Sequence, residues 1–150
     1  MIEIRFAQTA DHDQWLPLWL GYNEFYGRSG DTALHPDINM ATWKRLLDPA
    51  KPMWALVALS DQRLVGIAHY LFHPSTTDLA PACYLRDLFT IGDQRGRGVG
   101  QKLVEAVCAN ARRAGSDSIY WQTHEGNAQA RRLYDQIAQQ SEFLIYRKPC

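Results

Sequence analysis

The chain has 150 residues, and its 16 basic and 16 acidic side chains give a formal net charge of zero. This length suits one domain with a buried core, so we expect residues 1–150 to form a single domain. The balanced charge produces no overall field that would draw the protein to nucleic acid or to an anionic membrane. No apolar run is long enough to span a bilayer, and the first residues lack the layout of a signal peptide. We therefore expect neither nucleic-acid nor membrane partners.

The three cysteines, Cys83, Cys108 and Cys150, are widely spaced and odd in number. They form neither a Cys-x-x-Cys metal pair nor a disulfide framework. The histidines show no metal-ligand spacing either. We expect no metal site and, because free cysteines are typical of a reducing compartment, a cytoplasmic location.

The first part of the chain predicts a strand and then an amphipathic helix. Alternating apolar residues predict the strand over 3–7. Apolar residues at i, i+3, i+4 and i+7 predict the helix from Trp15 to Tyr26, and its first aromatic residues suit the core. Two interpretations stay open for the end of this helix, because aromatic and acidic groups there belong either to the core or to a pocket for a cationic amine. The residues concerned are Tyr22, Glu24 and Tyr26.

The remaining segments alternate between strand and helix patterns without a linker, repeat or low-complexity block. A turn at 60–63 joins two apolar runs into a hairpin, which indicates an antiparallel component. We expect an α/β fold with a mixed, mostly antiparallel sheet of about six to seven strands and about four helices. The predicted strands cover 3–7, 54–59, 64–72, 82–90, 118–123 and 142–147, and the predicted helices cover 15–26, 40–48, 98–114 and 127–138.

A glycine-rich stretch, Arg95-Gly96-Arg97-Gly98-Val99-Gly100, lies between a predicted strand and a predicted helix. Glycines remove the side chains that would keep a ligand off the backbone, and the first amides of a helix have no intrahelical partner. Such a turn suits a phosphate or pyrophosphate, and the two arginines add positive charge. Its spacing matches neither Gly-x-Gly-x-x-Gly nor the Gly-Lys-Ser/Thr loop. The alternative is a glycine-rich turn that binds no ligand.

A second group of residues follows the predicted strand 118–123. Asn127 opens a predicted helix, and Tyr134 lies about two helical turns later on nearly the same face. A phenol with an ordinary pKa of about 10 is a suitable proton donor to a departing thiolate. The alternative is that Tyr134 is an aromatic residue of the core.

Together these two stretches resemble the GNAT family of N-acetyltransferases. Arg-x-x-Gly-x-Gly, at residues 95–100, is similar to the family's loop for the pyrophosphate of acetyl-CoA, and Asn-x-x-Ala-x-x-Leu-Tyr, at 127–134, is similar to its next motif. The resemblance covers nearly the whole chain. Segments 84–90, 121–127 and 143–148 look closest to the branch of polyamine, histone and D-amino-acid acetyltransferases. The resemblance implies the GNAT fold, acetyl-CoA as cofactor, and acetyl transfer to a small-molecule amine of the polyamine or amino-acid type.

The resemblance also implies roles for particular residues. Residues 95–100 would hold the pyrophosphate, Asn127 would orient the pantetheine arm, and Tyr134 would donate a proton to the leaving sulfur. In this family the strand before the loop bulges away from its neighbour. The backbone groups freed in this way, here those of Leu88, Phe89 and Thr90, would bond the pantetheine and the acetyl oxygen. The amine would attack the acetyl group directly, through a tetrahedral intermediate. The family further implies a homodimer formed through the last strand.

The group that removes the proton from the amine is less clearly marked. Polyamine enzymes carry a Glu-Asp pair on the strand before the loop, whereas this chain has Arg86-Asp87, which argues against a polyamine. Strand alternation puts Leu85, Asp87 and Phe89 on one face, and Asp87 is the first candidate for substrate binding or proton relay. Arg86 either binds a substrate carboxylate, which suits an amino acid, or pairs with a neighbouring acid.

Glu24, His124 and Glu125 are weaker candidates for the base. For His124, the simpler interpretation is a hydrogen bond within its loop. Two other functions stay open beside small-molecule acetylation. One is acetylation of lysines or N-termini in proteins, and the other is a non-catalytic sensor that binds CoA.

Overall fold

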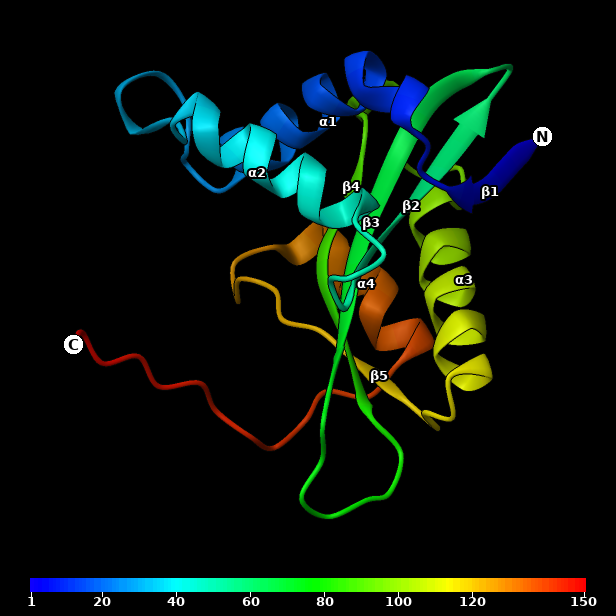
Figure 1. Ribbon diagram of the computed structural model, residues 1–150, viewed down its shortest axis with the longest axis vertical. Helices are drawn as coiled ribbons and strands as arrows, with labels where there is room; N and C mark the ends of the chain where they lie inside the picture. The colour runs from blue at the N-terminus through cyan, green and yellow to red at the C-terminus, as the bar shows by residue number, and fades with distance from the viewer.

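The computed structural model describes residues 1–150 and contains a five-stranded sheet with helices on both faces (Figure 1). The strands are β1 (Ile2–Phe6), β2 (Met53–Ser60), β3 (Arg63–His73), β4 (Ala82–Thr90) and β5 (Ile119–Tyr120), in that order across the sheet. The helices are α1 (His12–Phe25), α2 (Pro36–Leu47), α3 (Val99–Arg113) and α4 (Ala128–Ile137). None of these helices has the length and apolar character needed to cross a bilayer.

The pairing of the strands makes the sheet mixed and mostly antiparallel, which confirms the predicted α/β class. β1 to β4 pair antiparallel in sequence order, and only the pair of β4 and β5 is parallel. The turn between β2 and β3 passes through Asp61 and Gln62, both at positive φ. The strand count is lower than expected, because the sheet has five strands rather than six to seven.

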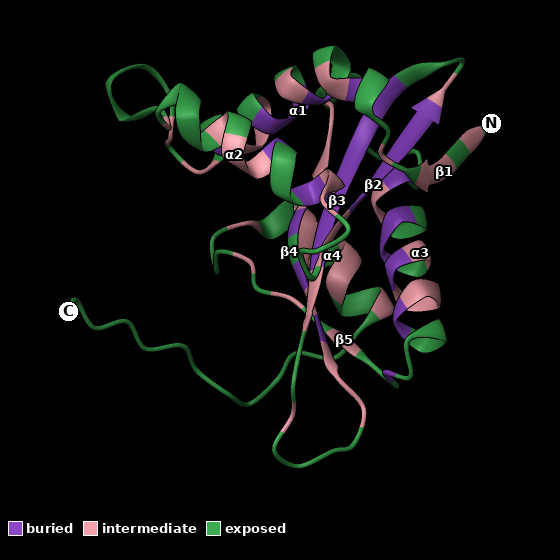
Figure 2. Cartoon of the chain, viewed as in Figure 1, coloured by how far each residue is buried: buried purple, intermediate pink, exposed green.

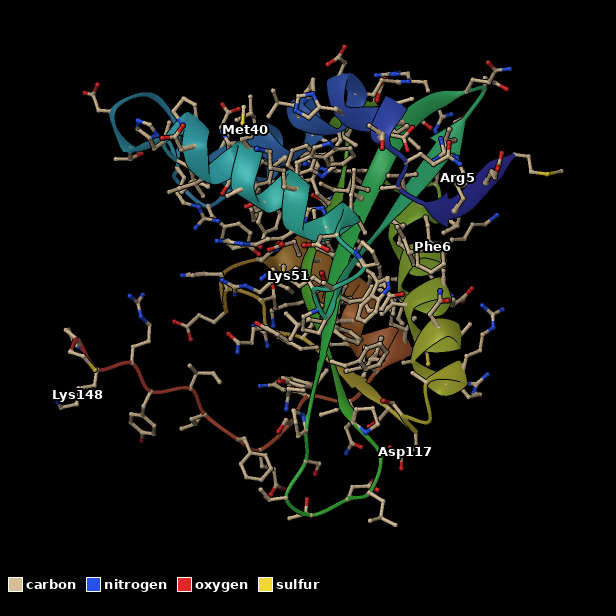
Figure 3. All side chains as sticks on the ribbon, viewed as in Figure 1. Arg5, Phe6, Met40, Lys51, Asp117 and Lys148 are labelled. Carbon is tan, nitrogen blue, oxygen red and sulfur yellow. The ribbon has the colours of Figure 1, made fainter.

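The strand that does not form is the C-terminal one, predicted over 142–147. Residues 139–150 contain no helix or strand, and the side chains of Phe143 and Tyr146 are 91% and 90% exposed. Figure 3 shows this tail, with Lys148 near its end, leading away from the sheet. A strand needs a neighbour to satisfy its backbone groups, and no strand of the same chain pairs with these residues. The strand-like pattern is present without a partner.

Two apolar clusters lie on opposite faces of the sheet. On one face, α1 and α2 bury Trp15, Trp19 and Trp43 against β2 and β3. On the other face, α3 buries Leu103 and Val107. β2 and β3 lie between the two layers, and Figure 2 shows buried residues running along both of them. Their nearly continuous apolar sequences follow from burial on both faces.

α3 approaches β3 closely at Gly66. A Cβ atom at this position would lie 2.9 Å from Val99 and 3.0 Å from Leu103. Glycine therefore lets the first turn of α3 pack directly on the sheet. Gly66 pairs with Thr90 of β4, so this contact sets the start of α3 beside the end of β4.

β4 separates from β5 partway along its length. The parallel pairing joins only Cys83 to Ile119 and Tyr84 to Tyr120. β5 is accordingly shorter than the predicted strand over 118–123. The later residues of β4 have no partner strand on that side, so their backbone groups are left for a ligand. This opening lies where the family resemblance predicts it.

A β-bulge in β4 corrects one expectation about its faces. In the pairing with β3, Asp87 is opposite His69 and Leu85 is opposite Tyr70, which leaves Arg86 as the extra residue. Leu85 packs in the cluster under α3, whereas Asp87 pairs with His69 on the α1 face. The prediction that Leu85 and Asp87 share a face is wrong, because the bulge breaks the alternation of the strand.

Candidate active site

The glycine-rich loop leaves a run of backbone amides without partners. Gly96 and Gly98 have positive φ angles of 76° and 79°, and Gly98 is the N-cap of α3 without a side-chain capping bond. The first helical bond runs from the Lys102 amide to the Gly98 carbonyl at 3.0 Å, and no amide from residue 96 to residue 101 donates to a protein group. Free amides that converge at a helix N-terminus form a site for an anion.

Gly96 and residues 98–101 of this run line a cavity of about 390 Å³. Arg95 belongs to the same wall: its Nε donates to the Thr90 carbonyl at 3.3 Å, and its guanidinium lies 5.8 Å from the centre of the Phe89 ring. Arg97 is exposed and does not line the cavity, so its predicted place in the cofactor site is not met. The predicted cofactor residues that do line it are Leu88, Phe89, Thr90, Arg95, Gly96, Gly98, Val99, Gly100, Asn127 and Tyr134.

α4 contributes Asn127 and Tyr134 to the wall of the cavity. Asn127 caps this helix, because its Oδ1 accepts a hydrogen bond from the Ala130 amide at 3.4 Å. Tyr134 packs edge-on against Trp121, with ring centres 5.3 Å apart. Burial raises the pKa of Tyr134 to about 12. The hydroxyl therefore keeps its proton at neutral pH, as a proton donor must.

The end of α1 lines the cavity with Tyr22, Phe25 and Tyr26. Tyr22 also lies beside Asp87: burial, followed by the charge of the Asp87 carboxylate, raises the pKa of Tyr22. Asp87 itself is only 8% exposed. Asp87 does not line the cavity itself. A buried carboxylate beside an aromatic ring suits an ammonium group, so the amine pocket that the sequence left open for Tyr22 and Tyr26 stays a prediction.

His69 is a candidate functional residue that the sequence analysis did not single out. Its Nδ1 lies 3.0 Å from Oδ2 of Asp87, and its Nε2 accepts a hydrogen bond from Nε1–H of Trp15 at 3.0 Å. Trp15 and His69 are 0% and 1% exposed. The available signal was a histidine inside the apolar run of β3, because a buried imidazole needs polar partners. The cavity residues that the sequence analysis missed are Phe25, Gln94, Gln101, Gln129, Ala130 and Leu133.

Arg86 forms no ion pair with an acidic side chain. Its Nη1 lies 3.5 Å from the Tyr84 hydroxyl, and this contact, followed by the charge of Asp87, raises the pKa of Arg86. The sequence left two roles open for this residue. The structure contains no pairing with a neighbouring acid, and Arg86 does not line the cavity, so its binding of a substrate carboxylate stays a prediction.

The weaker candidates for the base lie away from the cavity. Glu24 is exposed and does not line it, because a helix turns the side chain at i+2 away from the face that Tyr22 and Tyr26 share. The position of Glu24 therefore does not support the prediction that it belongs to the amine pocket. His124 accepts a hydrogen bond from the Gly126 amide at 3.0 Å, which is the loop interaction expected of it, and Glu125 is exposed.

A strand that separates from its neighbour, next to a helix start with free amides, is the arrangement that the family resemblance predicts for binding an acyl-CoA donor. The chain belongs to the Acetyltransferase (GNAT) family, whose sequence profile matches residues 14–138. It is an N-acetyltransferase, and acetyl-CoA is its acetyl donor. The predicted family, enzyme class and cofactor are confirmed.

The relatives agree with this membership. The chain is 29% identical over 149 residues to the D-amino-acid N-acetyltransferase of Saccharomyces cerevisiae, covering 98% of this chain and 90% of the relative. It is 28% identical over 135 residues to an uncharacterized N-acetyltransferase of Bacillus subtilis, covering 90% and 87%. The first of these matches the D-amino-acid branch that the sequence resembles.

Solved structures share the fold over the whole chain. A ribosomal-protein-alanine N-acetyltransferase from Brucella melitensis gives a TM-score of 0.80 at 22% identity and covers 100% of this chain and 99% of that one. An aminoglycoside N-acetyltransferase solved with CoA gives a TM-score of 0.80 at 21% identity and covers 100% and 96%. At these identities the likeness concerns the fold, which is the GNAT fold predicted from the sequence.

Proposed function

We propose that this enzyme transfers the acetyl group of acetyl-CoA to the primary amine of a small molecule of the amino-acid type. The observation that carries the proposal is the position of Tyr22. This residue lines the same cavity as Gly96 and residues 98–101, whose amides are free, and it also lies beside the Asp87 carboxylate. One end of the site thus suits an anion and the other end suits an ammonium group.

Bound acetyl-CoA supplies an activated acetyl thioester. The amides of residues 96–101 and the Arg95 guanidinium match the charge of its pyrophosphate. Asn127 faces the same cavity, where we place the pantetheine arm. The open edge of β4 at residues 88–90 offers backbone donors to the acetyl oxygen. One fixed donor of this kind stabilises a developing oxyanion by about 3 kcal/mol.

Two protons must leave the acceptor nitrogen, and the site offers a group for each. Asp87 takes the first proton from the ammonium, which frees the nitrogen lone pair for attack on the acetyl carbon. As the tetrahedral intermediate collapses, the C–S bond breaks and Tyr134 donates its proton to the leaving sulfur. The second proton from nitrogen then replaces the one that Tyr134 gave.

An amino acid fits the charges of the acceptor end better than a polyamine does. Arg86 and Asp87 are adjacent in β4, and Arg86 has no acidic partner. A zwitterion can place its ammonium near Asp87 and its carboxylate near Arg86, whereas a polyamine brings only positive charge. The name of the Saccharomyces cerevisiae relative points to the same class of acceptor, and specifically to D-amino acids.

We further propose that residues 1–150 act as one catalytic domain, in the cytoplasm and as a homodimer. The support for the dimer is the exposed apolar tail, which would pair residues 142–147 with a second copy. Light scattering should give a dimer mass for the full chain and a monomer mass after removal of residues 139–150. A monomer mass for the full chain would contradict the dimer.

The experiment that tests the proposed activity is release of free thiol from acetyl-CoA in the presence of different amines. The panel holds D- and L-amino acids, spermidine, spermine, aminoglycosides and a lysine peptide. We expect the fastest release with a D-amino acid, and loss of that release in Tyr134→Phe. Release with the lysine peptide alone would indicate protein acetylation. Thermal stabilisation by acetyl-CoA without release for any amine would indicate a sensor.

A further inference from the structure

Three buried side chains form a hydrogen-bonded series behind the acceptor end of the site. Nε1–H of Trp15 in α1 donates to Nε2 of His69 in β3 at 3.0 Å. Nδ1 of the same imidazole lies 3.0 Å from Oδ2 of Asp87 in β4. The fractional exposures of the three residues are 0%, 1% and 8%, so water does not replace these contacts.

The direction of the first bond fixes the proton on the imidazole. An indole N–H only donates, so Nε2 of His69 must accept and carries no hydrogen. A neutral imidazole then has its proton on Nδ1, from where it donates to Oδ2 of Asp87. Protonation of His69 on Nε2 would leave two N–H groups facing each other in a buried site, which is costly.

The groups that surround Asp87 and His69 do not supply another base. α1 presents the Tyr22 hydroxyl to Asp87, and Arg86 of β4 adds a positive charge nearby. Around His69, α1 presents the indole rings of Trp15 and Trp19. α2 contributes Trp43, which packs on Trp15. Asp87 is therefore the carboxylate of this site, and His69 is the group that holds it.

We infer that His69 is a positioning residue for the acceptor amine: it holds Asp87 through Oδ2 and leaves Oδ1 to accept the ammonium proton, while Trp15 fixes its tautomer. The inference rests on the proposed role of Asp87 as proton acceptor. The proton that moves goes from the substrate nitrogen to Oδ1, and the proton on Nδ1 of His69 stays in place.

The first test needs no acceptor and reads the tautomer by ¹⁵N NMR of the histidine rings, with His69→Asn used to assign the signals. We expect His69 to carry its proton on Nδ1 in the wild-type protein. Trp15→Phe should weaken this preference, since it removes the donor to Nε2 and leaves only the Asp87 carboxylate to hold the proton on Nδ1. Trp43→Phe is the matched control, because it truncates a buried indole that packs on Trp15 and should leave the tautomer unchanged. A wild-type proton on Nε2 would overturn the inference.

The second test measures kcat, KM and their pH dependence with the most active amine of the panel described above. We expect His69→Leu to lower kcat by about 10- to 100-fold, because a carboxylate displaced by about 1 Å loses its alignment. His69→Asn keeps an N–H donor toward Asp87 and should recover most of the loss. Affinity for acetyl-CoA should stay unchanged throughout.

Asp87→Asn separates failure of this inference from failure of the proposed function. If Asp87→Asn is inactive while His69→Leu keeps the wild-type kcat and pH profile, His69 has no positioning role and the proposed function stands. If Asp87→Asn keeps wild-type activity, the role of Asp87 fails and the inference fails with it. Thermal unfolding of each variant identifies a loss of activity that comes from misfolding, and His69→Asn and Trp15→Phe then carry the test.

Discussion

The donor end of the site and the acceptor end that we propose are built from different parts of the chain. The donor end consists of backbone groups close together in sequence, namely the amides of residues 96–101 and the open edge of β4. The proposed acceptor end depends on side chains that do not line the cavity themselves and that come from distant segments, since Trp15 and His69 are 54 residues apart and His69 and Asp87 are 18 apart. A short motif specifies the first kind of site, whereas strand register and a bulge specify the second.

This difference has a consequence for specificity. A site made of backbone amides keeps its chemistry when most side chains change, so it suits the cofactor that a whole family shares. A site made of side chains changes its chemistry with one substitution, so it suits an acceptor that differs between members. Variants at the donor end should therefore alter acetyl-CoA binding for every acceptor, and variants at the acceptor end should alter the choice of amine.

Tyr134→Phe should give the largest loss of activity, because it removes the group that we propose as the proton donor to the leaving sulfur. We expect kcat to fall about 100-fold or more, as is typical for loss of a general acid. Affinity for acetyl-CoA should be nearly intact, since the ring and its packing on Trp121 remain. The rate of thiol release measures kcat, and calorimetric titration measures the affinity for acetyl-CoA. Unchanged turnover would remove Tyr134 from the mechanism.

The pH profile sharpens the role of the same residue. The pKa of Tyr134 is raised to about 12, so its proton is retained to a higher pH than in a free phenol. A proton donor works below its pKa, and the alkaline loss of kcat should therefore lie well above the value of about 10 expected for an ordinary tyrosine. If kcat instead falls near pH 10 in the wild type, and this fall is absent in Tyr134→Phe, the result would contradict Tyr134 as a proton donor with a raised pKa.

Gly98→Ala tests whether the donor end is a backbone site. A Cβ at Gly98 meets no protein atom within 4 Å, so it would project into the space that the amides offer to a ligand. We expect acetyl-CoA affinity to fall at least about tenfold through crowding and strain at positive φ. Gly115→Ala is the matched control, with a φ of 96°, no atom within 4 Å and no place in the cavity. Equal affinities in the two variants would contradict a phosphate site at this loop.

Asp11→Asn should lower stability without changing either end of the site. Asp11 bonds Arg5 at 2.7 Å and accepts a hydrogen bond from the Gln8 amide at 2.7 Å. Its removal should cost about 1–3 kcal/mol of unfolding free energy at pH 7. The Arg5 hydrogen bond lowers the pKa of Asp11, so its stabilisation is present above the unfolded pKa and is lost as the pH falls through the folded pKa. Denaturant titrations of wild type and variant should converge as the pH is lowered, and an equal difference at all pH values would contradict this pairing.

The sequence predicted the parts of the molecule that depend on local pattern. The four helices, the β2–β3 hairpin and the glycine-rich loop all follow from spacing, turn residues or glycine. α1 and α2 begin at His12 and Pro36, earlier than the predicted starts at residues 15 and 40. The prediction of a C-terminal strand over 142–147 was wrong, because strand propensity does not supply a neighbouring strand. The short β5 has the same cause, since β4 leaves it after two pairs.

The acceptor end was only partly predictable because it depends on tertiary structure. Asp87 was found as an acid beside a family motif, but the face it occupies was misassigned because the bulge at Arg86 has no strong sequence signal. The histidine behind it was visible only as a polar residue in an apolar strand. Its two partners come from α1 and β4, and no spacing rule connects them.

The most direct test of the account compares a D-amino acid with the amine that lacks only its carboxylate, in the wild type and in Arg86→Gln. The account predicts that the wild type prefers the amino acid in kcat/KM by about tenfold or more, because a charge-assisted bond to Arg86 is worth about 1.5–3 kcal/mol. It also predicts that Arg86→Gln loses this preference and keeps its affinity for acetyl-CoA. The same preference in both proteins would contradict an acceptor held between Arg86 and Asp87.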